Sequence, residues 1–408
     1  MSPVNSLLDE LAWRGLHYQS TEGLADHLAA GAVRAYCGFD PTAPSLHVGN
    51  LVPVMGLVRL QHAGHRPVAL VGGGTGMIGD PSGRSSERQL NTAETVAGYT
   101  ASIRAQLERF LDFGGPHAAL VVDNAEWLSP MRAIEFLRDV GKHVTVNAML
   151  AKESVKARLD TGISYTEFSY MLLQGYDYVE LRRRYGVTLQ VGGSDQWGNM
   201  TIGTELIRKM DGASAHVLTY PLLLTAAGAK FGKSAGNAVW LDPEMTSPYQ
   251  FYQFWINADD RDVGKLLRYF TLMERAEIEA LDAATAQRPE RREAQNALAY
   301  DVTGRVHGAE AARVAQEMSS LLFAKGDPHA LSPAAFGALT KEIPYAEVPR
   351  GENGEVDVLE LFVATKLVPS KGAARRLLEQ GGLSISGRRL GPGDRTVQEG
   401  DYLAGRYL

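Results

Sequence analysis

The sequence has very little cysteine: Cys37 is the only one in 408 residues. A single cysteine excludes an internal disulfide and any zinc site built from several thiolates. No apolar run approaches the roughly 18 residues that a membrane helix needs. Residues 1–14 also lack the basic start and apolar stretch of a secretion signal. We therefore expect a soluble cytoplasmic protein that does not contact a membrane.

The chain also lacks the excess of positive charge typical of nucleic-acid-binding proteins, because its formal net charge is −6. The charge is unevenly distributed, however. From Ala364 onward there are eight Lys or Arg residues and four Asp or Glu residues, a net charge of +4, so residues 1–363 carry −10. This asymmetry indicates a basic terminal module after an acidic body.

The length of the chain suits two or three domains. In the first half, short β-like runs such as 35–39, 66–71, 118–122 and 188–191 alternate with helical patterns, which predicts a doubly wound α/β domain. Beyond Pro243 the pattern becomes helical, most clearly at 291–307 and 309–323. We expect an α/β domain at 1–243, a helical domain at 244–340, a linker at 341–355 and a small terminal domain at 356–408.

A polar motif follows the first predicted strand. The residues Asp40 to Asn50 lead into a helix, where free backbone N–H groups and the helix dipole favour an anion. Thr42 and His47 can donate hydrogen bonds to a phosphate there, and Gly49 has no side chain to keep a nucleotide base away. A lone histidine near a helix start is more often structural, so the motif alone leaves both interpretations open.

A second cationic motif, residues 230–234, contains Lys230, Lys233 and Ser234 around a glycine. Such a loop suits a departing phosphate, and a solvated basic loop is the alternative. It is not a P-loop, because a P-loop needs glycine at position 227, which is Ala227.

Between these motifs, residues 168–177 have a helical pattern that places Tyr170, Gln174 and Asp177 on one face. A polar face is usually only solvated, but the apolar stretch 171–173 predicts a helix covered on most sides. Residues 190–199 follow a strand, at the sheet edge where open α/β proteins bind ligands. The spacing of Gly74, Gly76 and Gly79 matches a dinucleotide fingerprint only weakly, because the chain continues as a turn at 80–83.

Together, the strings 36–50, 71–84, 190–199 and 230–234 resemble the tyrosyl branch of the class I aminoacyl-tRNA synthetases. Residues 47–50 resemble the first class signature, His-Ile-Gly-His, with Asn50 at its fourth position. Residues 230–234 resemble the second signature, Lys-Met-Ser-Lys-Ser. The resemblance implies a Rossmann-like catalytic domain with a dimer-forming insertion, although segment 142–165 shows no decisive pattern of its own.

The resemblance also implies which residues bind substrates. Tyr36 and Asp177 would bind the phenol of tyrosine. Asp80, Tyr170 and Gln174 would hold its ammonium group. The full tyrosine site would be Tyr36, Asp80, Tyr170, Gln174, Asp177 and Gln196. The ATP site would comprise Cys37, Gly38, Asp40, His47, Gly49, Asn50, Gly193, Asp195, Lys233 and Ser234. The catalytic residues would be Thr42, His47, Arg84, Arg88, Lys230 and Lys233.

Two of these assignments have alternatives. The resemblance places Cys37 on the ribose side of ATP, whereas its position alone suggests a small buried hydrophobe. Arg84 and Arg88 would reach the pyrophosphate, or would form an ordinary surface pair. Mg²⁺ would accompany ATP, with no tightly bound metal or organic cofactor.

The terminal segment contains a basic helical pattern at 367–378 and short strands around Ser386. It resembles an S4 RNA-binding module, in which Arg375, Arg376, Arg388 and Arg389 would contact tRNA phosphates. A solvated basic face is the alternative, and Ser386 stands where asparagine is usual.

By resemblance, the activity is activation of tyrosine by ATP to tyrosyl-adenylate with release of pyrophosphate, then transfer to the terminal ribose of tRNA(Tyr), by a homodimer. One rival is an RNA-binding or splicing protein derived from a synthetase. A second is a tryptophanyl relative, against which Tyr36, Asp177 and the string 193–198 argue.

Overall fold

The computed structural model describes residues 7–82, 90–160, 162–226, 228, 231–234, 237–323, 327–351 and 353–408. The chain divides into a larger unit, Met1–Ser247 with Phe254–Leu298, and a smaller unit, Pro248–Gln253 with Ala299–Leu408. The boundaries lie at the start of and within the helix α11 (Pro248–Ile256), and within the helix α14 (Glu293–His307). The expected helical segment 244–340 is thus shared between the units, and the domain limits at 243, 340 and 355 stay predictions.

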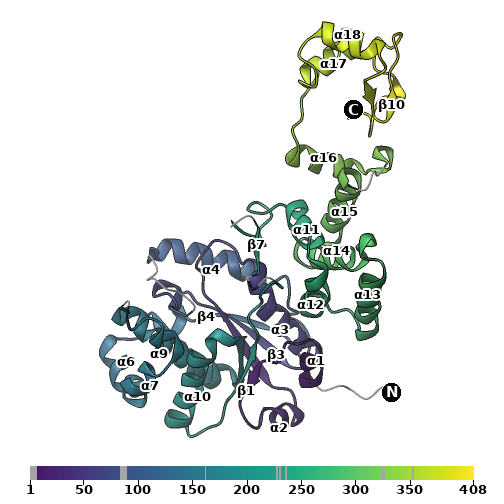
Figure 1. Ribbon diagram of the computed structural model, residues 1–408. Helices are drawn as coiled ribbons and strands as arrows, with labels where there is room; N and C mark the ends of the chain where they lie inside the picture. The colour runs from purple at the N-terminus through teal and green to yellow at the C-terminus, as the bar shows by residue number, and fades with distance from the viewer. Residues whose placement is uncertain are drawn as a thin grey trace. The chain divides into compact units, whose positions relative to one another are not determined.

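The larger unit is built on a sheet that, within the described residues, has six strands in the order β1-β6-β5-β2-β3-β4 (Figure 1). Neighbouring strands are parallel except at the β1–β6 edge. The parallel part has the doubly wound order that reverses between β2 and β5, which confirms the expected α/β class. The strands are β1 (Gln19–Ser20), β2 (Arg34–Phe39), β3 (Arg66–Val71), β4 (Leu120–Asp123), β5 (Val187–Gly193) and β6 (His216–Tyr220).

Helices cover both faces of this sheet. On one face, α3 (Leu51–His62) packs on β2 and β3, and α4 (Ala93–Leu107) packs on β3. On the other, α9 (Tyr165–Tyr185) and α10 (Trp197–Asp211) pack on β5 (Figure 1). Burial of five of the six residues of β3 follows from this double cover. The remaining helices of the sheet region are α1 (Leu7–Trp13), α2 (Leu24–Ala29), α5 (Ala125–Leu128), α6 (Ala133–Asp139), α7 (Val146–Leu150) and α8 (Glu153–Lys156).

Two glycines allow α9 and α10 to approach each other closely. A Cβ at Gly175 of α9 would lie 2.8 Å from Cγ2 of Ile202, and a Cβ at Gly203 of α10 would lie 2.9 Å from Cδ1 of Tyr178. Both distances are shorter than packed atoms tolerate, so both positions need glycine. Because Gly175 lies between Gln174 and Asp177, this close packing fixes the polar face of α9.

The larger unit also contains two helices of the later chain, α12 (Asp260–Phe270) and α13 (Arg275–Gln287). The backbone carbonyls of Tyr269 and Thr271, at the end of α12, accept hydrogen bonds from Nη2 of Arg59 at 2.8 Å each. Arg59 belongs to α3 and is buried. This guanidinium therefore satisfies carbonyls that a helix leaves unpaired at its end, and it joins α12 to the sheet region.

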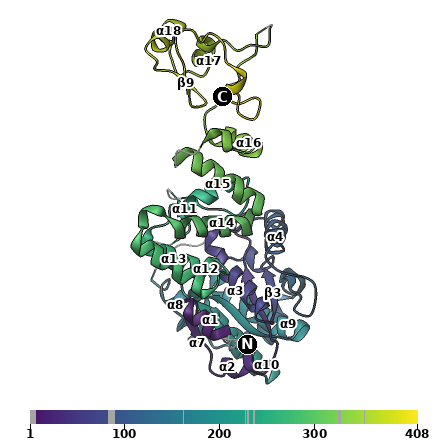
Figure 2. The same cartoon turned by 90° about the vertical axis from the view of Figure 1, so that its right-hand side faces the viewer.

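The smaller unit contains α15 (Ala309–Phe323), α16 (Pro333–Glu342), α17 (Val358–Ala364) and α18 (Lys371–Glu379). A hairpin follows α18, with strands β9 (Ser384–Ile385) and β10 (Arg388–Arg389) (Figure 2). Its turn residues Ser386 and Gly387 both have positive φ, 48° and 86°, as a two-residue type I′ turn requires. In the described ranges no helix is long and apolar enough to span a membrane.

Candidate active site

A cavity of about 530 Å³ opens at the carboxyl ends of β2 and β5, where the strand order reverses. This is the position at which doubly wound sheets bind ligands. The structure brings together here most of the residues predicted from the sequence. Its lining includes Tyr36, Cys37, Gly38, Asp40, Thr42, His47, Gly49, Asn50, Asp80, Tyr170, Gln174, Asp177, Gly193, Asp195 and Gln196.

The first signature forms a short helical turn, Val48–Asn50, that leads into α3. The side chain of His47 caps this turn by accepting a hydrogen bond from the backbone N–H of Gly49 at 3.1 Å. In return, Oδ1 of Asn50 accepts from the backbone N–H of His47 at 3.0 Å. Because Nδ1 accepts this bond, Nε2 is the ring nitrogen of His47 that can donate. Asn50 therefore keeps a capping function at the fourth signature position.

The second signature is described only in part. Lys230 lies outside the described residues, as do Arg84 and Arg88. The backbone of Lys233 and Ser234 forms a short strand, β7 (Lys233–Ser234), which pairs with β8 (Asn237–Ala238). Their side chains are not among those described. Phe231, between the two lysines, lines the cavity.

Asp177 lies deep in the cavity, with only 1% of its surface exposed. Its two carboxylate oxygens accept hydrogen bonds from Nε1 of Trp127 at 2.8 Å and from Nδ2 of Asn124 at 3.0 Å. The hydroxyl of Tyr36 is buried beside this carboxylate and has no hydrogen-bond partner in the described part of the protein. A ligand hydroxyl at this point could complete the bonding of both groups.

Burial raises the pKa of Asp177 to about 8, although the donors Asn124 and Trp127 act in the opposite direction. Between about pH 8 and the ordinary pKa of 3.8, the folded protein therefore holds a proton on Asp177 that the unfolded chain does not hold, so folding takes up a proton. The ligand-free protein accordingly loses stability as the pH rises through this window. Tyr36 stays a neutral phenol, because burial and the charge of Asp177 raise its pKa.

This linkage predicts a result for Asp177→Asn, which has no proton to lose at this position. Between about pH 5 and about pH 8, the melting temperature of the variant should rise relative to the unsubstituted protein by at least about 2 °C, or ~1 kcal/mol. Calorimetry at constant ionic strength measures the difference. The changed hydrogen bonding of the amide adds a constant offset, so only the slope is tested. A flat difference across the window would contradict the raised pKa.

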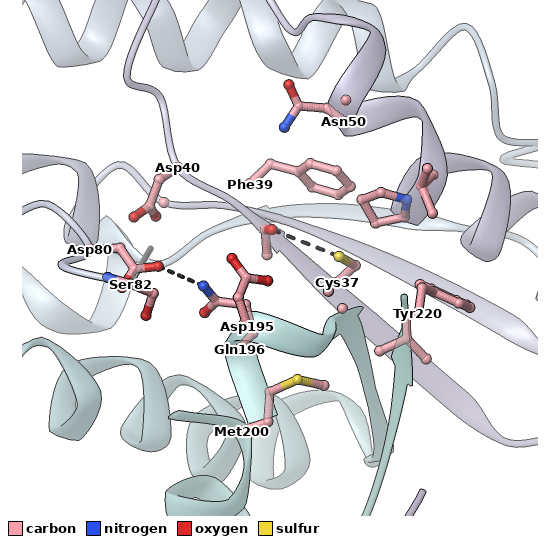
Figure 3. Close-up of a pocket in the computed structure, with 18 of the residues that line it drawn as sticks. Cys37, Phe39, Asp40, Asn50, Asp80, Ser82, Asp195, Gln196, Met200 and Tyr220 are labelled. Atoms are coloured by element: carbon pink, nitrogen blue, oxygen red, sulfur yellow. Dashed lines mark hydrogen bonds between the residues drawn. The ribbon is translucent and has the colours of Figure 1, made fainter. Parts of the chain in front are cut away.

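Polar groups from several elements meet at the other end of the cavity. Asp80 accepts from Nε2 of Gln196 at 2.7 Å, and Figure 3 shows this contact beside Asp195. Gln174 accepts from Nδ2 of Asn199 at 3.0 Å. The hydroxyl of Tyr170 donates to Asp40 at 2.6 Å. Carboxylate, amide and hydroxyl groups therefore converge as a binding site for a cation would require.

Cys37 fits both interpretations that the sequence left open. It is 3% exposed, as expected for a small buried hydrophobe, yet it also lines the cavity (Figure 3). Burial raises the pKa of its thiol to about 12, so the thiol is neutral and is a weak hydrogen-bond donor rather than a nucleophile.

The structure adds residues that the sequence did not single out. Thr75 donates to Asp40 at 2.7 Å, and the amide of Asn124 donates to Thr75 at 2.9 Å as well as to Asp177. These bonds connect the carboxylates of Asp40 and Asp177 through one buried chain. Gln190 lies within the string 190–199, lines the cavity, and has an amide oxygen without a partner in the described residues.

The arginines of the terminal module differ in what they can bind. Arg375 and Arg376 are exposed on α18. Arg389 is exposed but donates to the carbonyl of Gly381 at 2.7 Å. Arg388 is bonded through Nε and Nη2 to Asp401 at 2.6 Å and through Nη1 to Asp394 at 2.9 Å. Its guanidinium therefore joins parts of the module to one another.

Known proteins resemble the chain over nearly its whole length. A sequence model of the family described as "tRNA synthetases class I (W and Y)" matches residues 29–324. A second, "Tyrosine--tRNA ligase SYY-like C-terminal domain", matches residues 336–408. The tyrosine–tRNA ligase of Nocardia farcinica is 51% identical over 409 residues, which cover 98% of this chain and 95% of the relative. That of Anaeromyxobacter dehalogenans strain 2CP-1 is 52% identical over 404 residues, covering 99% and 96%.

Solved structures agree with this assignment. A C-terminally truncated mitochondrial tyrosyl-tRNA synthetase from Aspergillus nidulans has a TM-score of 0.71 and 30% identity, covering 79% of this chain and 95% of its own. A tryptophanyl-tRNA synthetase from Encephalitozoon cuniculi shares the fold at 15% identity and a TM-score of 0.54. The family-level matches and the cavity that joins the two signature regions lead to one conclusion: the chain belongs to the bacterial-type tyrosyl-tRNA synthetases, the class I enzymes that attach tyrosine to its tRNA.

Proposed function

We propose that Tyr36 and Asp177 select the amino acid by binding its phenolic hydroxyl. The observation that carries this proposal is the buried Tyr36 hydroxyl without a partner beside a carboxylate fixed by Asn124 and Trp127. Phenylalanine in the same pocket would leave these buried polar groups unpaired, at an energetic cost. At the other end, Asp80, Tyr170 and Gln174 hold the ammonium group, and Gln196 orients Asp80.

ATP occupies the part of the cavity between the first signature and the loop that follows β5. Asp195 accepts hydrogen bonds from the ribose hydroxyls, with Cys37 on the same side, while Gly38, Gly49 and Gly193 leave room for the nucleotide. His47, Thr42 and Asn50 surround the phosphates. Asp40 lines the same cavity and accepts hydrogen bonds from Tyr170 and Thr75. Lys230, Lys233, Ser234, Arg84 and Arg88 contact the phosphates or departing pyrophosphate, a proposal that rests on the resemblance of the signatures.

The first chemical step is attack of the tyrosine carboxylate on the α-phosphate of ATP. A carboxylate is already ionised, so no general base is needed, and the protein acts by positioning and by stabilising charge on the departing phosphates. Mg²⁺ enters as part of the ATP substrate.

ATP–pyrophosphate exchange, measured with each amino acid separately, tests the proposal without requiring the correct tRNA. Exchange with tyrosine alone would support the Tyr36–Asp177 pocket. Exchange with tryptophan would favour the tryptophanyl alternative. Absence of exchange with any amino acid would favour an RNA-binding or splicing protein derived from a synthetase.

For tRNA(Tyr), we propose phosphate contacts by the terminal module, principally through Arg375, Arg376 and Arg389. Arg388 contributes chiefly by holding the module together, since three of its guanidinium atoms already donate to Asp394 or Asp401. The reaction takes place in the cytoplasm, where ATP and tRNA are available.

We also propose a homodimer formed through an apolar surface between α6 and the start of α9. Six large apolar side chains in this segment are exposed, including Ile134 at 74% and Tyr165 at 69%. A surface of this kind is typical of a protein interface. It extends the segment 142–165 expected from the sequence towards α6, and consists of Ile134, Leu137, Val146, Leu150, Leu159 and Tyr165.

The dimer can be tested by Ile134→Asp. In a twofold-symmetric interface the substitution introduces two buried charges, so the dimer dissociation constant should rise by at least about 100-fold. Sedimentation velocity across a concentration series measures this change. Leu90→Asp is the matched control, because Leu90 is also exposed, at 63%, but lies outside the surface. Equal dissociation of both variants, or a monomeric unsubstituted protein, would refute the proposal.

A further inference from the structure

The middle of the second signature packs directly on the first. Gly232 has φ of +100°, and a Cβ there would lie 2.9 Å from Cγ2 of Val48 and 3.4 Å from the backbone nitrogen of Gly49. Glycine is therefore required for both conformation and space. The Phe231–Gly232 backbone is the described point at which the two signatures touch.

A short ladder continues from this contact. The carbonyl of Gly232 accepts from the N–H of Val239 at 3.1 Å, and the carbonyl of Val239 accepts from the N–H of Val48 at 2.9 Å. The N–H of Leu241 then donates to the carbonyl of Leu46 at 2.8 Å. The chain on both sides of His47 is thus hydrogen-bonded to the segment that follows the second signature.

The ring of Phe231 fixes this arrangement from the other side. It contacts the rings of Phe254, Trp255 and Phe270, with centroid distances of 5.1, 5.6 and 6.0 Å. Trp255 and Phe270 are almost fully buried. Phe270 ends α12, whose final carbonyls are bonded to Arg59 of α3. Since α3 starts at the first signature, the aromatic group that holds Phe231 is tied to the same helix that carries the ATP motif.

We propose that Phe231 is a positioning residue for adenylate formation. Its ring, held by Phe254, Trp255 and Phe270, sets the backbone of the second signature against Val48 and Gly49, and so sets the position of the Lys233 backbone relative to the first signature. The proposal rests on the assignment of Lys233 to the phosphates. It excludes a direct role for the ring in binding tyrosine, because the phenol and ammonium sites are formed by β2, α9 and the loops at Asp80 and Gln196.

The test is Phe231→Leu, which removes the ring contacts but keeps an apolar side chain. The first-order rate of tyrosyl-adenylate formation should fall about 10- to 100-fold, as small displacements of reacting groups do, while the dissociation constant of tyrosine changes less than about twofold. Phe231→Met should recover much of the rate, because methionine fills the space and contacts aromatic rings. Phe113→Leu is the matched control, as an exposed phenylalanine of the larger unit outside the cavity.

Phe254→Leu tests the aromatic support without altering the signature itself. If the ring contact carries the effect, the Phe231→Leu and Phe254→Leu losses should be less than multiplicative in the double variant. Unchanged rates in both single variants, or a parallel loss of tyrosine affinity, would overturn the proposal. Lys233→Ala is measured alongside: a normal rate there would refute the phosphate assignment, whereas a slow Lys233→Ala with a normal Phe231→Leu would refute only the positioning role.

Discussion

Asp177→Ala is expected to reduce kcat/KM for tyrosine by more than about 100-fold in ATP–pyrophosphate exchange, equivalent to ~3 kcal/mol. The substitution removes the proposed acceptor for the phenol and leaves the buried donors of Asn124 and Trp127 without the Asp177 carboxylate. The kcat/KM for phenylalanine should change little, because phenylalanine has no hydroxyl group to make this bond. Tyrosyl-tRNA synthetases are themselves the standard example of such selection, with rejection of phenylalanine by about 10⁵-fold.

Two further variants separate phenol recognition from general damage to α9. Trp127→Phe removes one donor to Asp177 and keeps an aromatic ring, so a smaller loss of about 10-fold is expected. Glu180→Ala is the matched control, since Glu180 is another buried carboxylate of α9, bonded to Tyr176 and Arg184 away from the cavity. If Asp177→Ala kept the preference for tyrosine, or if Glu180→Ala abolished it equally, Asp177 would not be the selecting group.

Much of this site could be predicted from the sequence because its residues belong to continuous strings. Tyr170, Gln174 and Asp177 were expected on one helix face, and all three line the cavity. The strand at 66–71 and the helix at 309–323 have the predicted bounds, since an uninterrupted apolar run and a helical pattern ended by Gly308 are strong local signals.

Asn124 and Trp127 could not be found in this way, and Thr75 was not singled out within the string 71–84. Asn124 and Trp127 lie about fifty positions before Asp177 in the sequence, at the end of β4 and in the four-residue helix α5. No local pattern marks them, because their function depends on β4 lying beside β3 in the folded sheet. Arg388 was predicted to contact tRNA phosphates, but its bonds to Asp394 and Asp401 arise only once the module has folded.

The second large effect is expected for Lys233→Ala, which should slow adenylate formation by about 100-fold, or about 3 kcal/mol. A cation at the leaving phosphate stabilises charge that develops in the transition state, so its loss should affect the rate more than binding. The tyrosine dissociation constant should be nearly unchanged, because the residues proposed to bind the phenol and the ammonium group belong to other parts of the cavity lining.

Rapid-quench measurement of adenylate formation at saturating ATP and tyrosine gives this rate, and equilibrium dialysis gives the tyrosine affinity. Lys341→Ala is the control, since it removes the same charge from an exposed residue of α16. The donor on Nε2 of His47 and the start of α3 remain in Lys233→Ala, so a slow but measurable reaction is expected rather than none. A rate within about threefold of the unsubstituted enzyme would mean that stabilisation of the leaving pyrophosphate lies with the first signature and the remaining cations instead.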